Sequence, residues 1–212
     1  MKETEITQIS HIQDYLKEKI LLDNFRKNAG LEKIPIIDIA TGRFLEIICL
    51  VANPKTVLEI GCGSGFSSYF LIKNLKDGYY TGIDLNKDRI KKAKEFIRSK
   101  FPKKQVRFKA GNALNIIPAL KGKFDLVFID AAKYEYPLYI KTLKNKLRSE
   151  ALIIADNIFY RNKIFKKVID KHDFNSVKGI KEYVRYVTED SCFSTCFIDV
   201  GDGISVTKFL EK

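Results

Sequence analysis

Three oxygen-bearing side chains follow two apolar stretches in the second half of the sequence. Asp130 ends the stretch 124–129, and Asp156 and Asn157 end the stretch 152–155. If these stretches are neighbouring strands, roughly 5 Å apart, the three side chains converge at one edge of a sheet. Two carboxylates and an amide carbonyl suit Mg²⁺, Mn²⁺ or Ca²⁺ better than Zn²⁺. The sequence therefore predicts a divalent-metal site, although each residue alone could instead form a cap, a turn or a solvated loop.

Lys133 stands three residues after Asp130, in the sequence Ile-Asp-Ala-Ala-Lys. Beside a metal its amine could act as the general base for a substrate hydroxyl, provided that burial or the charge of the metal lowers its pKa. The chain has 38 lysine and arginine residues in total, so an ordinary surface lysine is the alternative. The position of Lys133 beside the expected ligands favours the catalytic hypothesis.

A glycine-rich turn follows the apolar stretch 57–60, which we expect to be a buried parallel strand. Its glycines occupy three alternate positions: Gly61, Gly63 and Gly65. Glycine permits backbone angles and close approaches that a Cβ atom blocks. Ser67 or Ser68 could cap the helix that follows, and the free N–H groups of a helix start attract a carboxylate or phosphate. The pattern predicts a site for an anionic, nucleotide-like ligand.

This turn differs from the dinucleotide fingerprint, because its third glycine comes one residue early and Phe66 occupies the expected glycine position. Two acidic residues accompany it: Glu59 within the strand end, and Asp84 after the next apolar stretch, 79–83. Asp84 follows Gly63 by 21 residues, which suits a carboxylate that binds ribose hydroxyls. Phe66 disfavours a dehydrogenase, and the two acids disfavour a plain glycine turn.

The 212 residues, 45% hydrophobic and 30% charged, fit one globular domain over 1–212, in which 1–50 form an N-terminal helical segment. No apolar run reaches the length of a membrane span, and the polar start, Met-Lys-Glu-Thr-Glu, lacks a secretory signal. The four cysteines have neither zinc spacing nor disulfide density. We therefore expect a cytoplasmic protein with no membrane partner.

The formal net charge is +12, and lysine and arginine gather at 87–109, 141–148 and 161–171. Such a charge favours a polyanionic partner such as nucleic acid. The alternative is a solvated surface, because 87–100 has the pattern of an amphipathic helix whose lysines lie opposite its apolar positions. The composition leaves both open.

Apolar stretches and helical periodicity alternate along the chain. We expect helices at 6–29, 41–51, 66–76, 87–100, 112–120, 136–147 and 162–170, and strands at 56–60, 79–84, 105–109, 124–129 and 151–155. Residues 192–199 and 203–209 form a final hairpin around Val-Gly-Asp. This order predicts an α/β fold: a Rossmann-like, doubly wound, mainly parallel sheet with a C-terminal antiparallel hairpin.

The glycine turn with Glu59 and Asp84 resembles the class I methyltransferases, which bind S-adenosylmethionine (SAM). Motifs in 129–136, 153–157 and 201–203 are similar to those of the cation-dependent O-methyltransferases. That family includes catechol and caffeoyl-CoA O-methyltransferases and a bacterial branch that methylates 5-hydroxyuridine at the wobble position of tRNA. The segment 34–38, Ile-Pro-Ile-Ile-Asp, is most similar to the tRNA branch.

The resemblance implies SAM as cofactor, a bound Mg²⁺, Mn²⁺ or Ca²⁺, and a homodimer. The metal ligands of the family match Asp130, Asp156 and Asn157, and its catalytic residues match Lys133 and Asp130. Its cofactor pocket matches ten positions: Ile37, Glu59, Gly61, Gly63, Ser67, Asp84, Leu85, Asn112, Ala113 and Asp130. The chain departs from the family at three places: Ser-Glu-Ala at 149–151 instead of Gly-Gly, Asn112 instead of Asp, and Asn162 instead of Gly.

We expect a metal-assisted, SAM-dependent O-methyltransferase that acts on 5-hydroxyuridine in tRNA, an acceptor favoured by the charge and by the segment 34–38. The second hypothesis is methylation of a small catechol or a phenolic acyl-CoA, which the same residues could serve. The third, from another class, is a non-catalytic RNA-binding protein on the methyltransferase fold. The intact set Asp130, Lys133, Asp156 and Asn157 argues against it, because a binding protein does not need these residues.

Overall fold

A computed structural model describes residues 3–211, with side chains from residue 15 onward. The chain divides into two compact units, one up to Ile36 and the other from Ile37. The first unit consists mainly of one long helix, α1 (Glu3–Leu31), where helical periodicity predicted a helix over 6–29. Within the described residues, no helix has the length and apolar character needed to cross a membrane. The expectation of a single domain stays a prediction.

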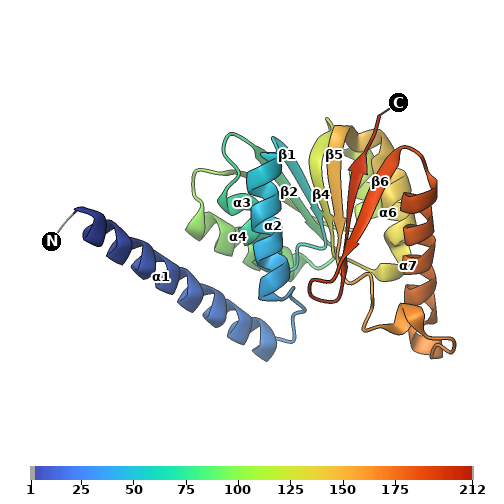
Figure 1. Cartoon of the computed structure of the whole chain (residues 1–212), viewed down its shortest axis with the longest axis horizontal. Helices are drawn as coiled ribbons and strands as arrows, with labels where there is room; N and C mark the ends of the chain where they lie inside the picture. Colours follow the sequence, from blue (N-terminus) through green and yellow to red (C-terminus); the bar gives the residue numbers. More distant parts are fainter. Residues whose placement is uncertain (1–2, 212) are drawn as a thin grey trace. The chain divides into compact units, whose positions relative to one another are not determined.

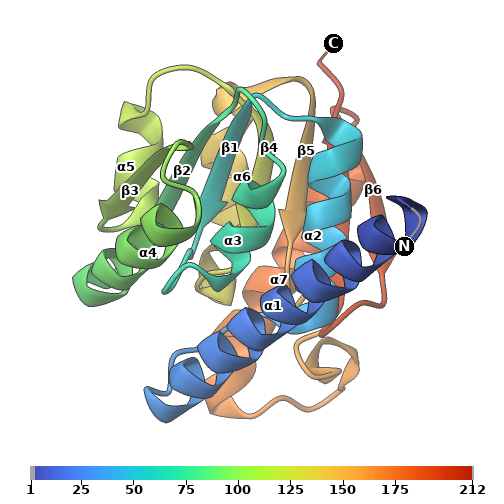
Figure 2. The same cartoon turned by 90° about the vertical axis from the view of Figure 1, so that its left-hand side faces the viewer.

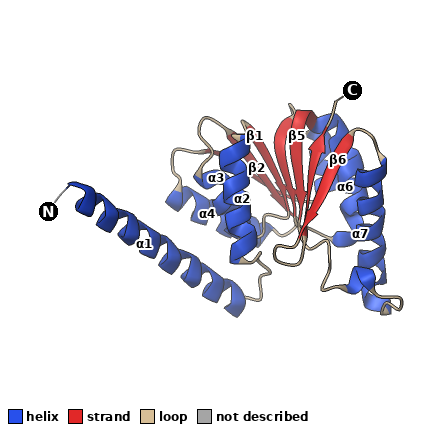
Figure 3. Ribbon diagram, viewed as in Figure 1, coloured by secondary structure: helices blue, strands red, loops and turns tan. Residues whose placement is uncertain are grey.

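The second unit is built on a seven-stranded sheet with the order β3-β2-β1-β4-β5-β7-β6 (Figure 3). The strands are β1 (Thr56–Ile60), β2 (Tyr79–Asp84), β3 (Gln105–Ala110), β4 (Phe124–Ile129), β5 (Leu147–Ala155), β6 (Phe193–Ile198) and β7 (Ile204–Phe209). The first five pair in parallel, and β7 runs antiparallel to both β5 and β6. This confirms the predicted doubly wound sheet with a C-terminal antiparallel hairpin.

Helices cover both faces of the sheet (Figures 1 and 2). One layer holds α2 (Ile39–Ala52), α3 (Phe66–Lys73) and α4 (Lys87–Lys100); the other holds α5 (Ala113–Ala119), α6 (Tyr136–Leu143) and α7 (Lys171–Glu189). Side chains alternate between the faces along each strand. In β4, Val127 and Ile129 join the core under α5, α6 and α7, and Leu126 and Phe128 are buried on the opposite face. Burial on both faces explains the continuous apolar strands.

The predicted helix over 162–170 is wrong. This segment holds only one 3₁₀ turn, η3 (Lys163–Phe165), and α7, which the sequence reading missed, begins at Lys171. Tyr160, Arg161 and Asn162 have φ angles of 47°, 52° and 59°, in the left-handed region. The Arg161 N–H donates to both carboxylate oxygens of Asp202, at 2.7 and 2.9 Å. A contact 41 residues away therefore fixes this loop against its local helical periodicity.

The start of β5 also differs from the prediction. The strand begins at Leu147, four residues before the expected start at Ala151. Its pairing with β4 shifts register between Phe124 and Leu126, and Glu150 has a φ of 67°. An irregularity of this kind interrupts the strand pattern in the sequence.

Candidate active site

The carboxyl ends of the parallel strands meet at one edge of the sheet, and the strand order reverses between β1 and β4. Ligands of open α/β sheets bind at such a switch point. Backbone hydrogen bonds hold the strand ends together there. The N–H of Asp130 donates to the carbonyl of Ile60 at 2.9 Å, and the N–H of Asp156 donates to that of Ile129 at 3.0 Å. The two predicted carboxylates therefore follow adjacent strands, as the sequence indicated.

The glycine turn packs directly against the end of β4. Gly61 has a φ of +92°, and a Cβ atom there would lie 2.0 Å from the carbonyl oxygen of Asp130. Gly65, also left-handed with φ +98°, would place a Cβ atom 3.2 Å from the Cα of Ala93 in α4. Any side chain at Gly61 would therefore push the ends of β1 and β4 apart.

Asp84 holds the turn from the end of β2. Its carboxylate is buried and accepts hydrogen bonds from the N–H of Gly63 at 2.9 Å and from the N–H of Asn86 at 2.8 Å. An ionised carboxylate has about four acceptor sites. Asp84 therefore fixes the turn and retains acceptor capacity for a ligand hydroxyl.

Glu59 lies entirely inside the protein, beneath the glycine turn. Its carboxylate accepts hydrogen bonds from the hydroxyls of Ser67 and Tyr80, and from Ser68 at 2.7 Å. Burial raises the pKa of Glu59 to about 7, although these three hydrogen bonds act in the opposite direction. The structure thus pairs two predicted cofactor residues, Glu59 and Ser67, with each other, and the pair anchors the first turn of α3 to β1. Their contact with a cofactor stays a prediction.

Four other cofactor positions were predicted from the sequence. Leu85 follows β2 and is 76% exposed, whereas Ala113 and Ile37 are buried. Asn112 caps α5, because its side chain accepts a hydrogen bond from the N–H of Leu114 at 2.8 Å. No contact described for these four residues identifies a ligand, and their role in binding a cofactor stays a prediction.

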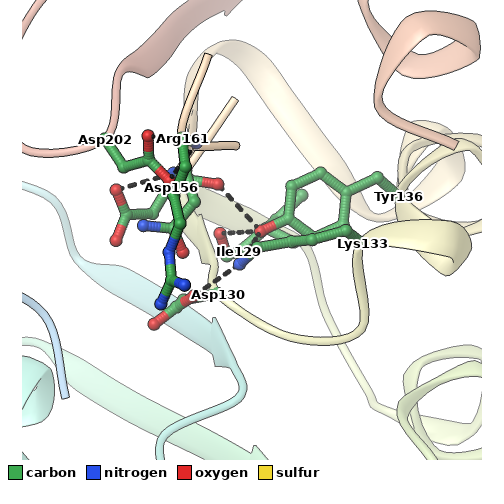
Figure 4. A network of polar contacts seen from close by, with 8 residues as sticks. Ile129, Asp130, Lys133, Tyr136, Asp156, Arg161 and Asp202 are labelled. Atoms are coloured by element: carbon green, nitrogen blue, oxygen red, sulfur yellow. Dashed lines mark hydrogen bonds and ion pairs between the residues drawn. The ribbon is translucent and has the colours of Figure 1, made fainter. Parts of the chain in front are cut away.

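Lys133 lies between two oxygen atoms on the other side of the switch point (Figure 4). Its Nζ donates to Asp130 Oδ1 at 2.7 Å and to the hydroxyl of Tyr136 at 2.9 Å. The Tyr136 hydroxyl in turn lies 3.1 Å from the carbonyl oxygen of Ile129 and 3.0 Å from that of Asp156. Tyr136 therefore ties the lysine to the ends of β4 and β5. No role for Tyr136 was predicted from the sequence, although it belongs to the motif at 129–136.

The electrostatics keep Lys133 protonated. Burial by itself lowers the pKa of Lys133, but Tyr136 and Asp130 together outweigh burial and raise the pKa above its ordinary value. Burial alone therefore does not bring the pKa of Lys133 below its ordinary value, which the general-base hypothesis required of burial or of the metal charge. The reason is that the ammonium has two oxygen partners inside the site.

Asp156 is the more deeply buried of the two predicted carboxylate ligands, with 2% of its surface exposed. Burial and the charge of Asp130 raise the pKa of Asp156 to about 7, although the N–H of Asn157 donates to its Oδ1 at 2.8 Å. Asn157 has a left-handed φ of 55°. A cation beside these oxygens would relieve the repulsion between the two carboxylates, and carboxylate and amide oxygens are the ligands of hard divalent cations. Among the described residues, no three His, Cys, Asp or Glu side chains group as metal ligands; the predicted set has two carboxylates and one amide.

The fold and this site define a class I methyltransferase: five parallel strands, an antiparallel C-terminal pair, and a glycine turn at the switch point. The family model described as O-methyltransferase matches residues 10–210. The chain therefore belongs to the O-methyltransferase family, a family of enzymes. A protein of Mycobacterium tuberculosis named as a probable O-methyltransferase is 25% identical over 199 residues, which cover 92% of this chain and 87% of that protein.

Two solved structures share the fold. The O-methyltransferase of Bacillus cereus, in complex with S-adenosylhomocysteine (SAH), has a TM-score of 0.80 and 21% identity, and the match covers 89% of this chain and 90% of that one. TomG of Streptomyces achromogenes, an O-methyltransferase involved in tomaymycin synthesis, in complex with SAM, has a TM-score of 0.81 and 22% identity, with coverages of 90% and 89%.

Proposed function

We propose that the chain transfers the methyl group of SAM to the hydroxyl oxygen of 5-hydroxyuridine in tRNA, assisted by a divalent cation. One observation supports this most: the glycine turn, Asp84 and the group around Lys133 lie together at the carboxyl ends of neighbouring strands. The solved relatives of Bacillus cereus and Streptomyces achromogenes hold SAH and SAM, which supports SAM as the cofactor.

The residues of the β1 and β2 ends would hold the cofactor. Gly61 and Gly63 are half-buried and would present backbone without side chains to the methionine portion. Asp84 has acceptor capacity for the ribose hydroxyls. The methyl group of SAM is already activated as a sulfonium. The main task of the protein is therefore to place an oxygen atom in line with it.

The β4 and β5 ends would hold the cation, through Asp130, Asp156 and Asn157. The buried carboxylate of Asp156 and the half-buried carboxylate of Asp130 repel each other, and they fit this role. When bound, a divalent cation supplies positive charge that lowers the pKa of a hydroxyl beside it. The ammonium of Lys133, held by Asp130 and Tyr136, adds a second positive charge at this position. The third N–H of this ammonium can donate a hydrogen bond to the acceptor oxygen, which stabilises that oxygen as its proton leaves to water.

The acceptor is inferred from charge. The net charge is +12, and Arg161 lies four residues past Asn157. In Figure 4 the Arg161 side chain extends from the side of Asp202 toward Asp130, where it could meet a phosphate. A small catechol or phenolic acyl-CoA is the second candidate, favoured by a solved structure of similar fold from Staphylococcus aureus that is named as a caffeoyl-CoA O-methyltransferase.

The experiment measures methyl transfer to hydroxyuridine-bearing tRNA and to a catechol, with Mg²⁺ or EDTA, at several salt concentrations. We expect activity to vanish in EDTA and to return with Mg²⁺ or Mn²⁺. tRNA binding should fall with a log–log salt slope of roughly −0.7 to −0.9 per phosphate neutralised, and Arg161→Ala should reduce that slope by about 1. Lys163 is a poorer choice, because it already pairs with Asp173. If the protein methylates the catechol and does not bind tRNA at low salt, the small phenolic acceptor replaces tRNA as the proposed substrate. Full activity in EDTA would show that methyl transfer does not need a divalent cation.

A further inference from the structure

The outer face of α7 contains a groove that the proposed chemistry does not use. The groove has a volume of about 350 Å³. Its lining comes from α7 and from the segment just before it: Ile169, Phe174, Val177, Lys178, Lys181, Glu182 and Arg185. The groove therefore lies in the part of the chain that differs from the prediction: it is formed by α7 and the end of the loop that precedes this helix.

The groove combines an apolar floor with a basic rim. Phe174 is 54% exposed, so that its ring is accessible to a ligand, and it lies beside the buried Val177. Three cationic side chains and one carboxylate line the rim. The carboxylate of Glu182 lies 3.9 Å from Lys178, and that of Glu189 lies 4.0 Å from Arg185. Both are exposed pairs of a kind that contributes little. The rim therefore keeps a net positive charge beside an exposed aromatic ring.

The groove belongs to a basic segment that starts at the candidate site. Residues 161–185 include eight lysines and arginines against three aspartates and glutamates. The segment begins at Arg161, next to the predicted metal ligands, and ends within α7. In α7, Gly179 packs so closely behind the catalytic segment that a Cβ atom there would lie 2.6 Å from the carbonyl oxygen of Lys133. The helix that carries the groove therefore packs directly against the backbone of Lys133 and Tyr134.

A basic groove with an exposed aromatic ring is the combination that binds single-stranded nucleic acid, because bases stack on the ring while cations bind phosphates. We infer that the α7 groove binds unpaired nucleotides of RNA: Phe174 stacks on a base, and Lys178, Lys181 and Arg185 bind the phosphates around it. This inference rests on the proposed function, since it assigns the surface that would hold the tRNA next to its modified base.

Other occupants fit the groove less well. An apolar partner helix would cover three cations without supplying counter-charges, which costs free energy. A second copy of this chain has the same net charge of +12 and would add repulsion. An RNA strand supplies both the anionic groups and the flat apolar surfaces that these residues require.

The test uses the full-length protein and fluorescence anisotropy with a labelled 15-nucleotide oligouridylate and with tRNA. The groove variant replaces Lys178, Lys181 and Arg185 by Ala. Its matched control replaces two lysines and one arginine on the exposed face of α4: Lys91, Lys94 and Arg98. Loss of three phosphate contacts should reduce the salt slope by about 2 and weaken binding at low salt at least about tenfold. The α4 variant should stay within about twofold of the wild type, although it loses the same charge.

The stacking role is tested with Phe174→Ala and Phe174→Leu. Both should weaken oligouridylate binding about fivefold or more, because Leu keeps the apolar volume and lacks the ring. Thermal unfolding of every variant checks that the fold is intact. Equal losses in the α7 and α4 variants would show a non-specific charge effect, and unchanged binding in the α7 variant would remove the groove; both outcomes overturn the inference.

Methylation assays separate this inference from the proposed function. If the wild type methylates hydroxyuridine-bearing tRNA and the α7 variant does so equally well at all salt concentrations, the groove inference is wrong and the proposed function stands. If an acidic peptide of matched charge competes with oligouridylate at equal affinity, the groove is a general anion surface and the assignment to RNA is overturned. If the wild type neither binds nor methylates tRNA, the proposed acceptor is overturned directly.

Discussion

The two halves of the candidate site are built in different ways. At the ends of β1 and β2, the shape is set by the backbone: Gly61 and Gly63 have left-handed φ angles, and Asp84 accepts hydrogen bonds from peptide N–H groups. At the ends of β4 and β5, the site is set by charged side chains, with Lys133 between Asp130 and Tyr136. The halves meet where Gly61 packs against the backbone of Asp130.

This difference separates two tasks. A backbone turn that is held by its own hydrogen bonds keeps one shape, which suits a ligand that must be held in one position. Buried charges respond to the protonation state of their neighbours, which suits a step in which an oxygen gains or loses a proton. We therefore expect substitutions in the first half to change cofactor binding, and substitutions in the second half to change turnover.

The largest effect is expected from Lys133→Met, which removes the ammonium but keeps most of the apolar stem. Methyl transfer should fall by about 10²–10⁴-fold, the usual contribution of a positioned acid or base. Cofactor affinity, measured by calorimetry, should change little, because Lys133 belongs to the charged half. The matched control is Lys121→Met at an exposed position. Undiminished turnover in Lys133→Met would end the catalytic assignment.

The second effect concerns the junction of the two halves. Gly61→Ala should lower the free energy of unfolding by about 2–4 kcal/mol, because it adds both a left-handed φ penalty and a clash with Asp130. Gly122→Ala is the control: it has a φ of +82° but no heavy atom within 4 Å of the added Cβ, so only about 1 kcal/mol is expected. Urea unfolding gives both values. Equal losses would mean that the close approach to Asp130 is unimportant.

The third effect concerns Asp84, whose carboxylate holds the glycine turn. Asp84→Ala should weaken SAM binding by about 1.5–3 kcal/mol, the range for a hydrogen bond to a charged group. Asp88→Ala, an exposed change in the first turn of α4, is the control. Calorimetry that finds the same SAM affinity in Asp84→Ala and the wild type would place the ribose elsewhere.

The smallest effect concerns the pH dependence of stability. The pKa of Glu59 is raised by burial from 4.5 to about 7 in the folded chain, so the folded state binds its proton more tightly than the unfolded state. The stabilisation is therefore fully present below about pH 4.5 and is lost as the pH rises through about 7. From pH 5 to pH 8 the wild type should lose on the order of 1–3 kcal/mol more than Glu59→Gln does.

Urea unfolding at both pH values measures this difference. Asp156, whose pKa burial and Asp130 also raise to about 7, has a contribution of the same sign in both proteins. If the free energy of unfolding changes equally with pH in the wild type and in Glu59→Gln, burial does not raise the pKa of Glu59.

Much of the fold could be predicted because its signals are local. The run 124–129 is apolar at nearly every position, and Asp130 follows it directly. Both the strand and its polar end can therefore be predicted from the sequence. The glycines of the turn are needed wherever the backbone must approach a neighbouring strand, and their spacing is visible in the sequence.

The errors arise where distant contacts decide the structure. The loop at 160–162 depends on Asp202 in the final hairpin, which local periodicity cannot show. A stripe of buried Val177, Ile180, Tyr183 and Val187 could have indicated α7, but lysines and glutamates separate these residues. The burial of Glu59 with two serines and Tyr80 requires the packing of β1, β2 and α3 together.

The most direct test of the central claim is nucleoside mass spectrometry of tRNA that bears 5-hydroxyuridine, after incubation with the purified chain, SAM and Mg²⁺. The account predicts that 5-hydroxyuridine falls and its methylated form rises by the same amount with the wild type, and that neither changes with Lys133→Met. Unchanged tRNA nucleosides in a reaction where the same preparation methylates a catechol would contradict tRNA as the acceptor. Unchanged tRNA and unchanged catechol would contradict the proposed catalytic arrangement itself.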